Sequence, residues 1–402
     1  MQPDATASSP HRFWRSDRLD VRLAQRRLDA TQLAGLARAL AAVHAEPGQP
    51  AEPAPPPAAR AASARAVVAE QAPALGGAAR GCEACLAEAL AACGDVLTRR
   101  AQPPLARRLH GRLCCEEIHV DPHGRTKLGP PAEGAAGDPC EDLAVLAVAF
   151  AACGASDTAR ALIGAYAEAA GDYTLYRVLD AHLALAGLAA AARALAAGGD
   201  RDAAHARAER LLAAPALLAP PAGPPFVLAV AGSIASGKTT LARQLAAAHG
   251  APAISADAAR PDGLAALEPD ARDAAYAELF ARAGEVLASG RPVVLDACFP
   301  TRTLRAALRA FAERRGAPLL VVECRVDAAH ARRRLEERAA AQGRPAADWL
   351  ALRAQLKAEW EPIRELPRAE HLTIDTALEE ADVHLPRVAQ ALARRIGGPH
   401  RV

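Results

Sequence analysis

The sequence predicts a mainly α-helical first half and an α/β second half, in which a parallel sheet is covered by helices on both faces. From residue 226 onward, short apolar runs alternate with helical patterns, which is typical of a buried parallel sheet. Before residue 214, apolar residues recur mostly at spacings of three and four, the period of a helix. We therefore expect a helical domain over residues 1–214, a Pro/Ala-rich linker over 215–225 and an α/β domain over 226–402.

Composition narrows the class of protein. The chain has 402 residues, of which 51% are apolar and 23% charged, as in ordinary globular proteins with room for two domains. The net charge of +2 gives no electrostatic reason to expect nucleic acid or a membrane surface as a partner. Arg193 interrupts the longest Ala-rich stretch, so we expect no membrane span. Nine cysteines without an export signal predict reduced thiols and a cytoplasmic location.

The first half contains several helical patterns and one strand-like region. Two short strand-like pieces, at 117–120 and 126–128, flank a Pro-His-Gly turn. The helical patterns cover residues 17–44, a stretch from about 59, residues 82–100 and 142–152, and a succession of segments up to 212.

The second half alternates between short apolar runs typical of strands and longer helical patterns. The expected strands are residues 226–231, 253–255, 292–297, 319–324 and 372–374. The expected helices are residues 240–248, 271–289, 303–315, 328–341 and 385–396, several of them ended by glycine.

A glycine-rich motif lies between the first of these strands and the first of these helices. The stretch from Gly232 to Thr239 fits G-x-x-x-x-G-K-[ST], in which backbone N–H groups and a helix N-terminus surround a polyphosphate. Lys238 would reach the β- and γ-phosphates of ATP, and the Thr239 hydroxyl would coordinate Mg²⁺. The candidate nucleotide-binding residues are Gly232, Ser233, Ile234, Ala235, Ser236, Gly237, Lys238, Thr239 and Thr240.

The choice of lysine in this motif is informative in itself. The chain contains three lysines, Lys127, Lys238 and Lys357, and uses arginine for its other basic residues. A lysine at this position therefore indicates that a compact ammonium group is required there.

Two aspartates end neighbouring strands of the predicted sheet. Asp296 follows an apolar run, where an aspartate can orient Mg²⁺; the alternative is that it caps the next turn. Asp257 ends the preceding strand, where a carboxylate can accept the proton of a substrate hydroxyl; the alternative is a helix N-cap. Both lie at the strand ends where open α/β sheets bind ligands.

Arginines are concentrated between residues 325 and 344. Arg334 and Arg338 are four residues apart and share one helix face. We expect this pair to close over the phosphates and neutralise negative charge in the transition state. Other arginines of the run are expected on the solvated surface.

The second half resembles the small P-loop kinases, the family that includes gluconate kinase. The matching stretches are AGSIASGKTT, SAD at Asp257, GRPVVLDACF at Asp296, and the arginine run that ends at Arg338. The resemblance implies phosphorylation of a small hydroxyl-bearing substrate with ATP and Mg²⁺. Two alternatives stay open: a nucleotide-dependent interaction protein whose helical half meets a protein partner, and a simple NTPase.

Residues 107–150 resemble the C-lobe of aminoglycoside-phosphotransferase-like proteins, in which H-G-D-x-x-x-x-N supplies a catalytic aspartate and a metal-binding asparagine. This chain keeps His110-Gly111 but has Arg112 and Glu117 at those two positions, and no carboxylate at 128–129. Arginine cannot serve as a general base. Asp142 matches a structural aspartate of the family, whereas the strands and ATP-binding lysine expected before Asp17 are missing. We expect the first half to be a truncated, inactive relative.

Several cysteines raise the alternative of a zinc site. Cys82 and Cys85 are spaced as ligands, with Cys114, Cys115 and His119 downstream. Because the first two lie in a helical pattern and the next two are adjacent, buried thiols are the better interpretation.

Overall fold

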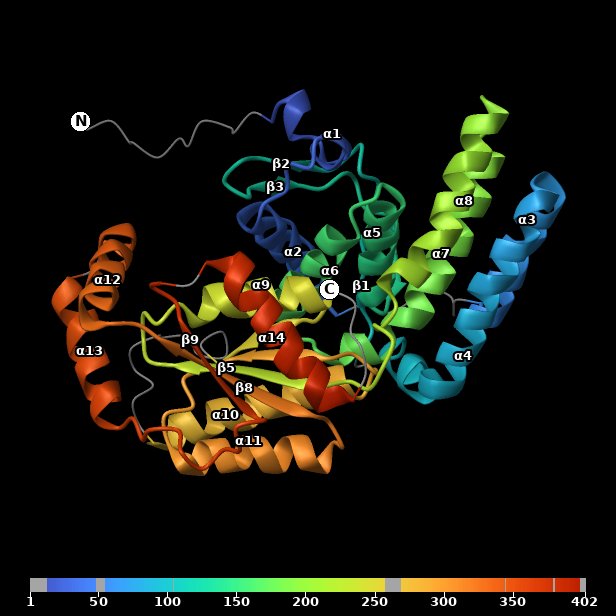
Figure 1. The fold of residues 1–402 in the computed structure, drawn as a ribbon. Coiled ribbons are helices and arrows are strands. Elements are labelled where there is room, and N and C mark those ends of the chain that lie inside the picture. The colour runs from blue at the N-terminus through green and yellow to red at the C-terminus, as the bar shows by residue number, and fades with distance from the viewer. Residues whose placement is uncertain are drawn as a thin grey trace, which may run out of the picture. The chain divides into compact units, whose positions relative to one another are not determined.

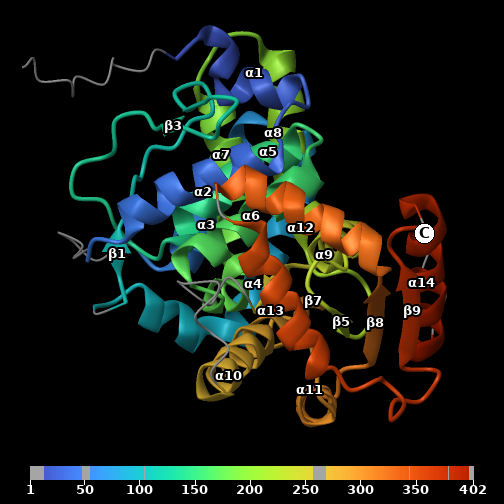
Figure 2. The same ribbon diagram turned by 90° about the vertical axis from the view of Figure 1, so that its left-hand side faces the viewer.

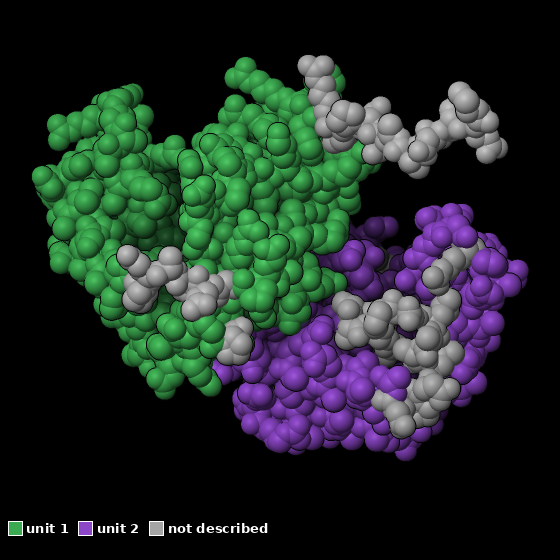
Figure 3. Space-filling model, turned by 180° about the vertical axis from the view of Figure 1, so that it is seen from behind, with its two compact units in different colours: residues 1–172, 178–218 green, residues 173–177, 219–402 purple. Residues whose placement is uncertain are grey.

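The computed structural model describes residues 13–47, 55–103, 105–256, 269–343, 345–378 and 380–397. The chain forms two compact units, coloured separately in Figure 3. Unit 1 comprises residues 1–172 and 178–218, and unit 2 comprises residues 173–177 and 219–402.

Unit 1 is built from eight α-helices in its described part. Helix α7 packs against α3, α4, α5 and α8, and α2 packs against α6. The helix α7 is long and apolar enough to cross a membrane by length and composition alone, but 61% of it is buried in the protein, so it packs as a core helix. The helices are α1 Leu19–Ala24, α2 Ala30–His44, α3 Pro57–Gln71, α4 Gly76–Arg100, α5 Cys140–Ala152, α6 Ser156–Ala170, α7 Leu179–Ala196 and α8 Arg201–Leu218.

Two antiparallel ribbons accompany the helices of unit 1. The predicted strands around the Pro-His-Gly turn are confirmed in shorter form, as β2 His119–Val120 and β3 Thr126–Lys127. A second ribbon, of β1 Arg107–Arg108 and β4 Ala136–Gly137, was not predicted because, unlike β2 and β3, its two strands are not joined by a short turn that marks them.

The helical pattern predicted over residues 17–44 is divided into α1 and α2. The division occurs at Asp29, whose carboxylate accepts the backbone N–H of Gln32 at 2.9 Å while the Gln32 side chain accepts the N–H of Asp29 at 3.0 Å. This reciprocal capping box satisfies two of the N–H groups that a helix start leaves unpaired, so a new helix begins here.

The segment predicted as a linker, 215–225, begins inside a helix. Helix α8 continues through Pro215 to Leu218, although a proline in a helix interior usually costs about 3 kcal/mol. The Pro215 ring packs tightly against α7: a Cβ added at Gly187 would lie 2.9 Å from its Cγ atom. Close packing of α7 on α8 therefore overrides the local preference, and the non-helical connection is shorter than expected.

Unit 2 contains a five-stranded parallel sheet in the order β6-β7-β5-β8-β9. All five predicted strands are confirmed. Strand β5 lies at the centre, with every residue buried. The strands are β5 Val227–Gly232, β6 Ala253–Ser255, β7 Val293–Asp296, β8 Leu319–Arg325 and β9 His371–Asp375.

Helices cover both faces of this sheet, as predicted (Figure 1). On one face, apolar residues of the strands form a continuous core with α9 Lys238–His249 and α14 Ala381–Ile396. The other face carries α10 Pro269–Leu287 and α11 Arg302–Arg314.

A pair of helices, α12 Ala328–Gln342 and α13 Ala346–Ala358, packs together outside the sheet (Figures 1 and 2). Their contact is a small apolar cluster that includes Leu335, Trp349 and Leu352. Helix α13 was not predicted.

Candidate functional site

The loop after β5 turns back on itself through three residues with positive φ. These are Gly232 at 144°, Ala235 at 63° and Gly237 at 82°. A Cβ at Gly232 would lie 2.6 Å from the carbonyl oxygen of Cys324, and a Cβ at Gly237 would lie 3.1 Å from Thr376 Oγ1. Glycine is therefore needed at both positions, for conformation and for space.

Lys238 begins α9 directly after this loop, so its backbone belongs to the helix N-terminus. Its Nζ atom donates a hydrogen bond to the Ser233 carbonyl oxygen at 3.0 Å, which places the ammonium group within the curve of the loop. Ser236 is fully buried, and its hydroxyl is without a hydrogen-bond partner among the described residues. Thr239 and Thr240, in the first turn of α9, are exposed. The loop thus has the Lys238 ammonium group within its curve and a helix N-terminus at its end, an arrangement suited to an anion.

Asp296 ends β7 beside the loop. It pairs in register with Val230 of β5 and Ser255 of β6, and it is buried. Its backbone carbonyl accepts the N–H of Ala256 at 3.0 Å, which joins the ends of β6 and β7. Asp257, the next residue, lies outside the described part of the chain, so its predicted role stays a prediction.

The two arginines predicted to act together have different surroundings. Arg334 reaches the loop: Nη1 donates to the Ala235 carbonyl at 3.2 Å and to Thr376 Oγ1 at 3.0 Å, and Nη2 donates to the Thr376 carbonyl at 2.7 Å. Arg338 instead lies over the ring of Trp349, 4.3 Å from its centroid, a cation–π contact that joins α12 to α13. Of the pair, Arg334 is the one at the loop.

Neighbouring arginines of the run lie on the surface, as expected for some of them. Arg332 and Arg333 pair with Glu336 and Glu337 on the same exposed face of α12. Such exposed pairs contribute little to stability.

Sequence reasoning missed Arg353. This residue lies on α13, and its Nη1 atom donates to Ser233 Oγ at 3.1 Å and to the Ile234 carbonyl. Burial lowers the pKa of Arg353, although a guanidinium stays charged at any physiological pH. The apolar spacing of Trp349, Leu352 and Leu356 was the available signal for α13, but nothing in it identifies which arginine reaches the loop.

Helices α12 and α13 also cover the tip of the loop. Ile234 and Ala235 pack against the apolar cluster of Leu335, Ala339 and Trp349. Three cationic side chains therefore contact this loop, Lys238 from α9, Arg334 from α12 and Arg353 from α13.

Cys324 lies directly beneath the loop, in register with Gly232. Burial raises the pKa of the Cys324 thiol to about 12, against the opposing effect of Lys238. The thiol is therefore protonated at neutral pH and serves as a small buried group rather than a nucleophile.

In unit 1, the His-Gly turn is held by Asp142. The carboxylate of Asp142 accepts the backbone N–H groups of His110 at 2.6 Å and Gly111 at 3.0 Å, and it lies 3.1 Å from Nε2 of His44. Arg112, at the next position, is exposed. Both carboxylate oxygens of Asp142 are thus occupied, by the backbone of the His-Gly turn and by the His44 side chain.

No group of three or more His, Cys, Asp or Glu side chains that could hold a metal ion occurs among the described residues. Cys82 lies buried in α4 and donates to the Leu212 carbonyl oxygen at 2.8 Å. The interpretation as a buried thiol is confirmed for Cys82. It is wrong for Cys85 and Cys114, which are exposed, and Cys115 is half-buried.

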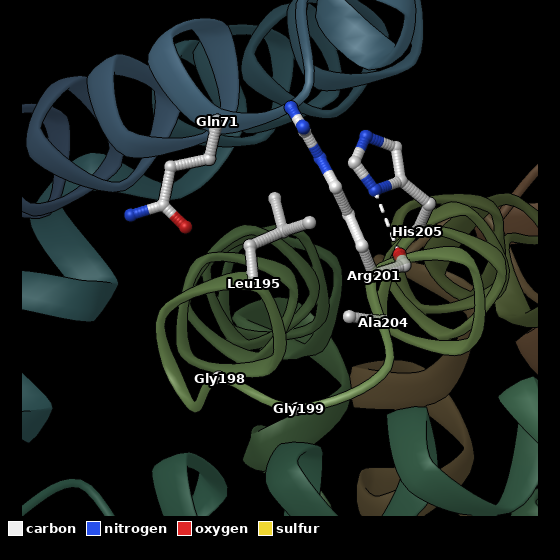
Figure 4. A pocket seen from close by; sticks show the side chains of 7 residues that line it. All are labelled: Gln71, Leu195, Gly198, Gly199, Arg201, Ala204 and His205. Carbon is white, nitrogen blue, oxygen red and sulfur yellow. Dashed lines mark hydrogen bonds between the residues drawn. The ribbon is translucent and has the colours of Figure 1, made fainter.

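A cavity of about 310 Å³ lies in unit 1 beside the Gly198–Gly199 turn. Figure 4 shows Arg201 and His205 extending from α8 at its edge, with Gln71 of α3 opposite. His205 Nδ1 lies 3.0 Å from the Arg201 carbonyl oxygen. The residues that line this cavity do not include a pair of side chains suited to general acid–base catalysis, so we propose no reaction for it.

The comparisons with known proteins concern unit 2. Residues 227–359 match the family model of an AAA domain. The match lies within unit 2 and covers four of the five strands of its parallel sheet, β5, β6, β7 and β8. Similar solved structures are a gluconokinase from Sinorhizobium meliloti 1021 (25% identity, 44% of this chain and 95% of that one, TM-score 0.34) and a putative kinase from Chloroflexus aurantiacus j-10-fl (23%, 44% and 100%, 0.36). A third is Kti12 of Chaetomium thermophilum in complex with ADP-AlF3 (23%, 43% and 100%, 0.34). No curated protein matches the chain.

Proposed function

We propose that unit 2 is an ATP-dependent kinase that transfers the γ-phosphate to a small hydroxyl-bearing substrate. The observation that carries the proposal is the loop of residues 232–239, whose curved backbone is contacted by Lys238, Arg334 and Arg353. Phosphoryl transfer depends chiefly on positioning and on stabilising negative charge, and these three cations supply the second requirement at one place.

The metal that accompanies ATP would be held by Thr239 and Asp296. The hydroxyl and carboxylate oxygens of these residues are hard ligands of the kind that Mg²⁺ prefers, and Asp296 is buried at the strand end next to the loop. Bound Mg²⁺ neutralises charge on the phosphate oxygens.

The acceptor side rests on Asp257, which we propose receives or orients the proton of the substrate hydroxyl. Support comes from the position of Ala256, which is hydrogen-bonded to the end of β7 and so brings the chain to the same sheet edge as Asp296. Arg334 and Arg353 would neutralise the phosphates from the α12–α13 side, while Arg338 holds that pair of helices together.

For unit 1, we propose an inactive phosphotransferase-like domain. The support is that Asp142 fixes the His110-Gly111 turn while Arg112 stands exposed where a catalytic base would be needed. Unit 1 would bind a protein partner through its surface and would not catalyse a reaction. We propose a cytoplasmic location for the protein.

The test is a screen of phosphate acceptors with Mg·ATP on the full chain, followed by Asp257→Asn. We expect the substitution to abolish transfer to the acceptor and to leave ATP binding within about twofold, since Asp257 is assigned no contact with nucleotide. ATP hydrolysis that continues with no acceptor phosphorylated in the wild type would instead favour a simple NTPase. Binding with neither reaction would favour the nucleotide-dependent interaction protein.

A further inference from the structure

The segment that follows β7, residues 297–301, connects the two halves of the proposed site. It begins directly after Asp296, and the carbonyl oxygen of Cys298 accepts the N–H of Gly232 at 3.2 Å. The chain that leaves Asp296 is thus bonded to the first glycine of the phosphate loop. A shift of this segment would therefore move both the backbone of Gly232 and the position of the Asp296 carboxylate.

This segment contains a strained residue. Phe299 has φ +49°, a left-handed conformation that is costly for a bulky residue and persists only where surrounding contacts enforce it. Its ring is fully buried and lies 5.2 Å from the ring of Tyr276, and its N–H donates to the Tyr276 hydroxyl at 2.8 Å. These contacts hold the amide side of Phe299.

Arg305 holds the carbonyl side. This arginine of α11 is fully buried, and its Nη1 atom donates to the carbonyl oxygens of Phe299 and Pro300, each at 3.0 Å. Its Nε atom donates to the carboxylate of Glu365. Placing a guanidinium in the interior is expensive unless it is paired and hydrogen-bonded. Two acceptors of Arg305 are backbone atoms of the turn at Phe299, whereas its Nη2 atom is buried without a hydrogen-bond partner among the described residues.

We propose that Arg305 is a positioning residue of the nucleotide site. It fixes the carbonyl groups of Phe299 and Pro300, with Phe299 in its strained conformation, so that the Cys298 carbonyl stays bonded to the Gly232 amide and Asp296 keeps its place at the end of β7. Among the described residues, no hydrogen bond joins Arg305 to the phosphate loop or to Asp296, so Arg305 acts through the backbone of Phe299 and Pro300. The inference rests on the proposed binding of Mg·ATP by unit 2.

The experiment measures the affinity of the full chain and of four variants for ATP, once with Mg²⁺ and once with EDTA. The ratio of the affinity with Mg²⁺ to that with EDTA is the Mg²⁺-dependent gain. Arg305→Gln is expected to reduce this gain about tenfold, as is typical when a residue that orients a ligand is removed. Arg305→Lys keeps a cation that can donate to the carbonyls, so it should retain part of the gain.

Two variants separate positioning from simple loss of stability. Glu365→Gln removes the charge partner but leaves the two carbonyl contacts of Arg305, so Tm should fall while the gain stays unchanged. Arg309 lies one turn further along α11 and pairs with Glu370 rather than with the 297–301 segment. Arg309→Gln should therefore leave the gain unchanged as well.

A gain that survives Arg305→Gln would overturn the inference while leaving the proposed function intact. If that variant does not fold, a gain in Arg305→Lys equal to that of the wild type would overturn it instead. Failure of the wild type to bind Mg·ATP would overturn the proposed function and the inference together.

Discussion

At the scale of single residues, Lys238 is the side chain whose removal should lower the affinity for Mg·ATP most directly. Its ammonium lies within the curve of the loop, and a charged hydrogen bond to phosphate contributes enough that Lys238→Ala should weaken Mg·ATP binding by at least about tenfold. Calorimetric titration, and loss of ATP-induced thermal stabilisation, would measure this. Lys357→Ala, an exposed lysine of α13, is the matched control; equal weakening in the two variants would mean that nucleotide binds elsewhere.

Gly232 should be intolerant of any side chain. Alanine there would meet the Cys324 carbonyl at 2.6 Å in a backbone conformation with φ 144°, so Gly232→Ala should lower the free energy of unfolding of unit 2 by more than about 2 kcal/mol. Gly81→Ala, in α4 with open space around it, should instead stabilise by about 0.5–1 kcal/mol. Denaturant unfolding of the two variants gives the comparison, and a stable Gly232→Ala protein would contradict the loop geometry.

The ion pair of Glu365 with Arg305 predicts a pH dependence. Burial opposes ionisation, but the hydrogen bond from Arg305 lowers the pKa of Glu365 to about 2, below its ordinary value of 4.5. The ionised form is therefore stabilising above pH 4.5, and its contribution is lost as the pH falls toward 2. The difference in Tm between wild type and Glu365→Gln should shrink over that range. A difference that is constant from pH 6 to pH 2 would contradict the pairing.

At the scale of elements, the α12–α13 pair depends on very few contacts. Trp349 supplies the buried ring beneath Arg338 and the apolar surface under the loop tip. Replacement of a buried tryptophan by alanine typically costs about 3–5 kcal/mol, which a cluster this small cannot absorb. We expect Trp349→Ala to raise hydrogen exchange across α12 and α13 while the central strand β5 stays protected. Uniform loss of protection would show that the pair is not a separate unit of stability.

The elements that sequence reasoning identified are those whose local signal agrees with their packing. The strands of unit 2 are apolar runs because the sheet is buried on both faces, and the loop motif fixed the position of Lys238. Helix α13 was missed because only one side of it is buried, the rest is mainly Ala with single Asp, Arg, Gln and Lys residues, and no side chain caps its start. At Pro215 the local signal and the packing disagree. Proline ordinarily ends a helix, so a linker was predicted there, but contact with Gly187 keeps α8 helical through this residue.

The candidate site was predicted in part for similar reasons. A motif records which residues line the backbone turn, and it located the loop and the strand end at Asp296. It does not record which side chains arrive from other helices, so Arg353 was missed and the different surroundings of Arg334 and Arg338 were not anticipated. Such contacts depend on how α12 and α13 pack, which no short spacing encodes.

At the scale of the whole molecule, the two units differ in what their chemistry can support. Unit 2 gathers cations at its loop, whereas in unit 1 the exposed Arg112 follows a His-Gly turn that Asp142 has already engaged. Arg112→Ala should therefore change the rate of phosphoryl transfer by no more than about twofold, as for an ordinary surface substitution. Steady-state kinetics with the acceptor from the screen provide the measurement. A loss of tenfold or more would show that unit 1 takes part in the reaction.

The scarcity of aromatic residues gives the packing of Trp349 a practical consequence. The chain has three tryptophans: Trp14 is exposed, Trp360 is half-buried, and Trp349 is buried against Arg338 and the loop tip. With Trp14 and Trp360 replaced by phenylalanine, the emission of the protein would come from the one indole that lies where α12, α13 and the phosphate loop meet. Its emission wavelength would shift to the red if water reached the indole, so a separation of those helices from the loop would be detectable in real time without an attached dye.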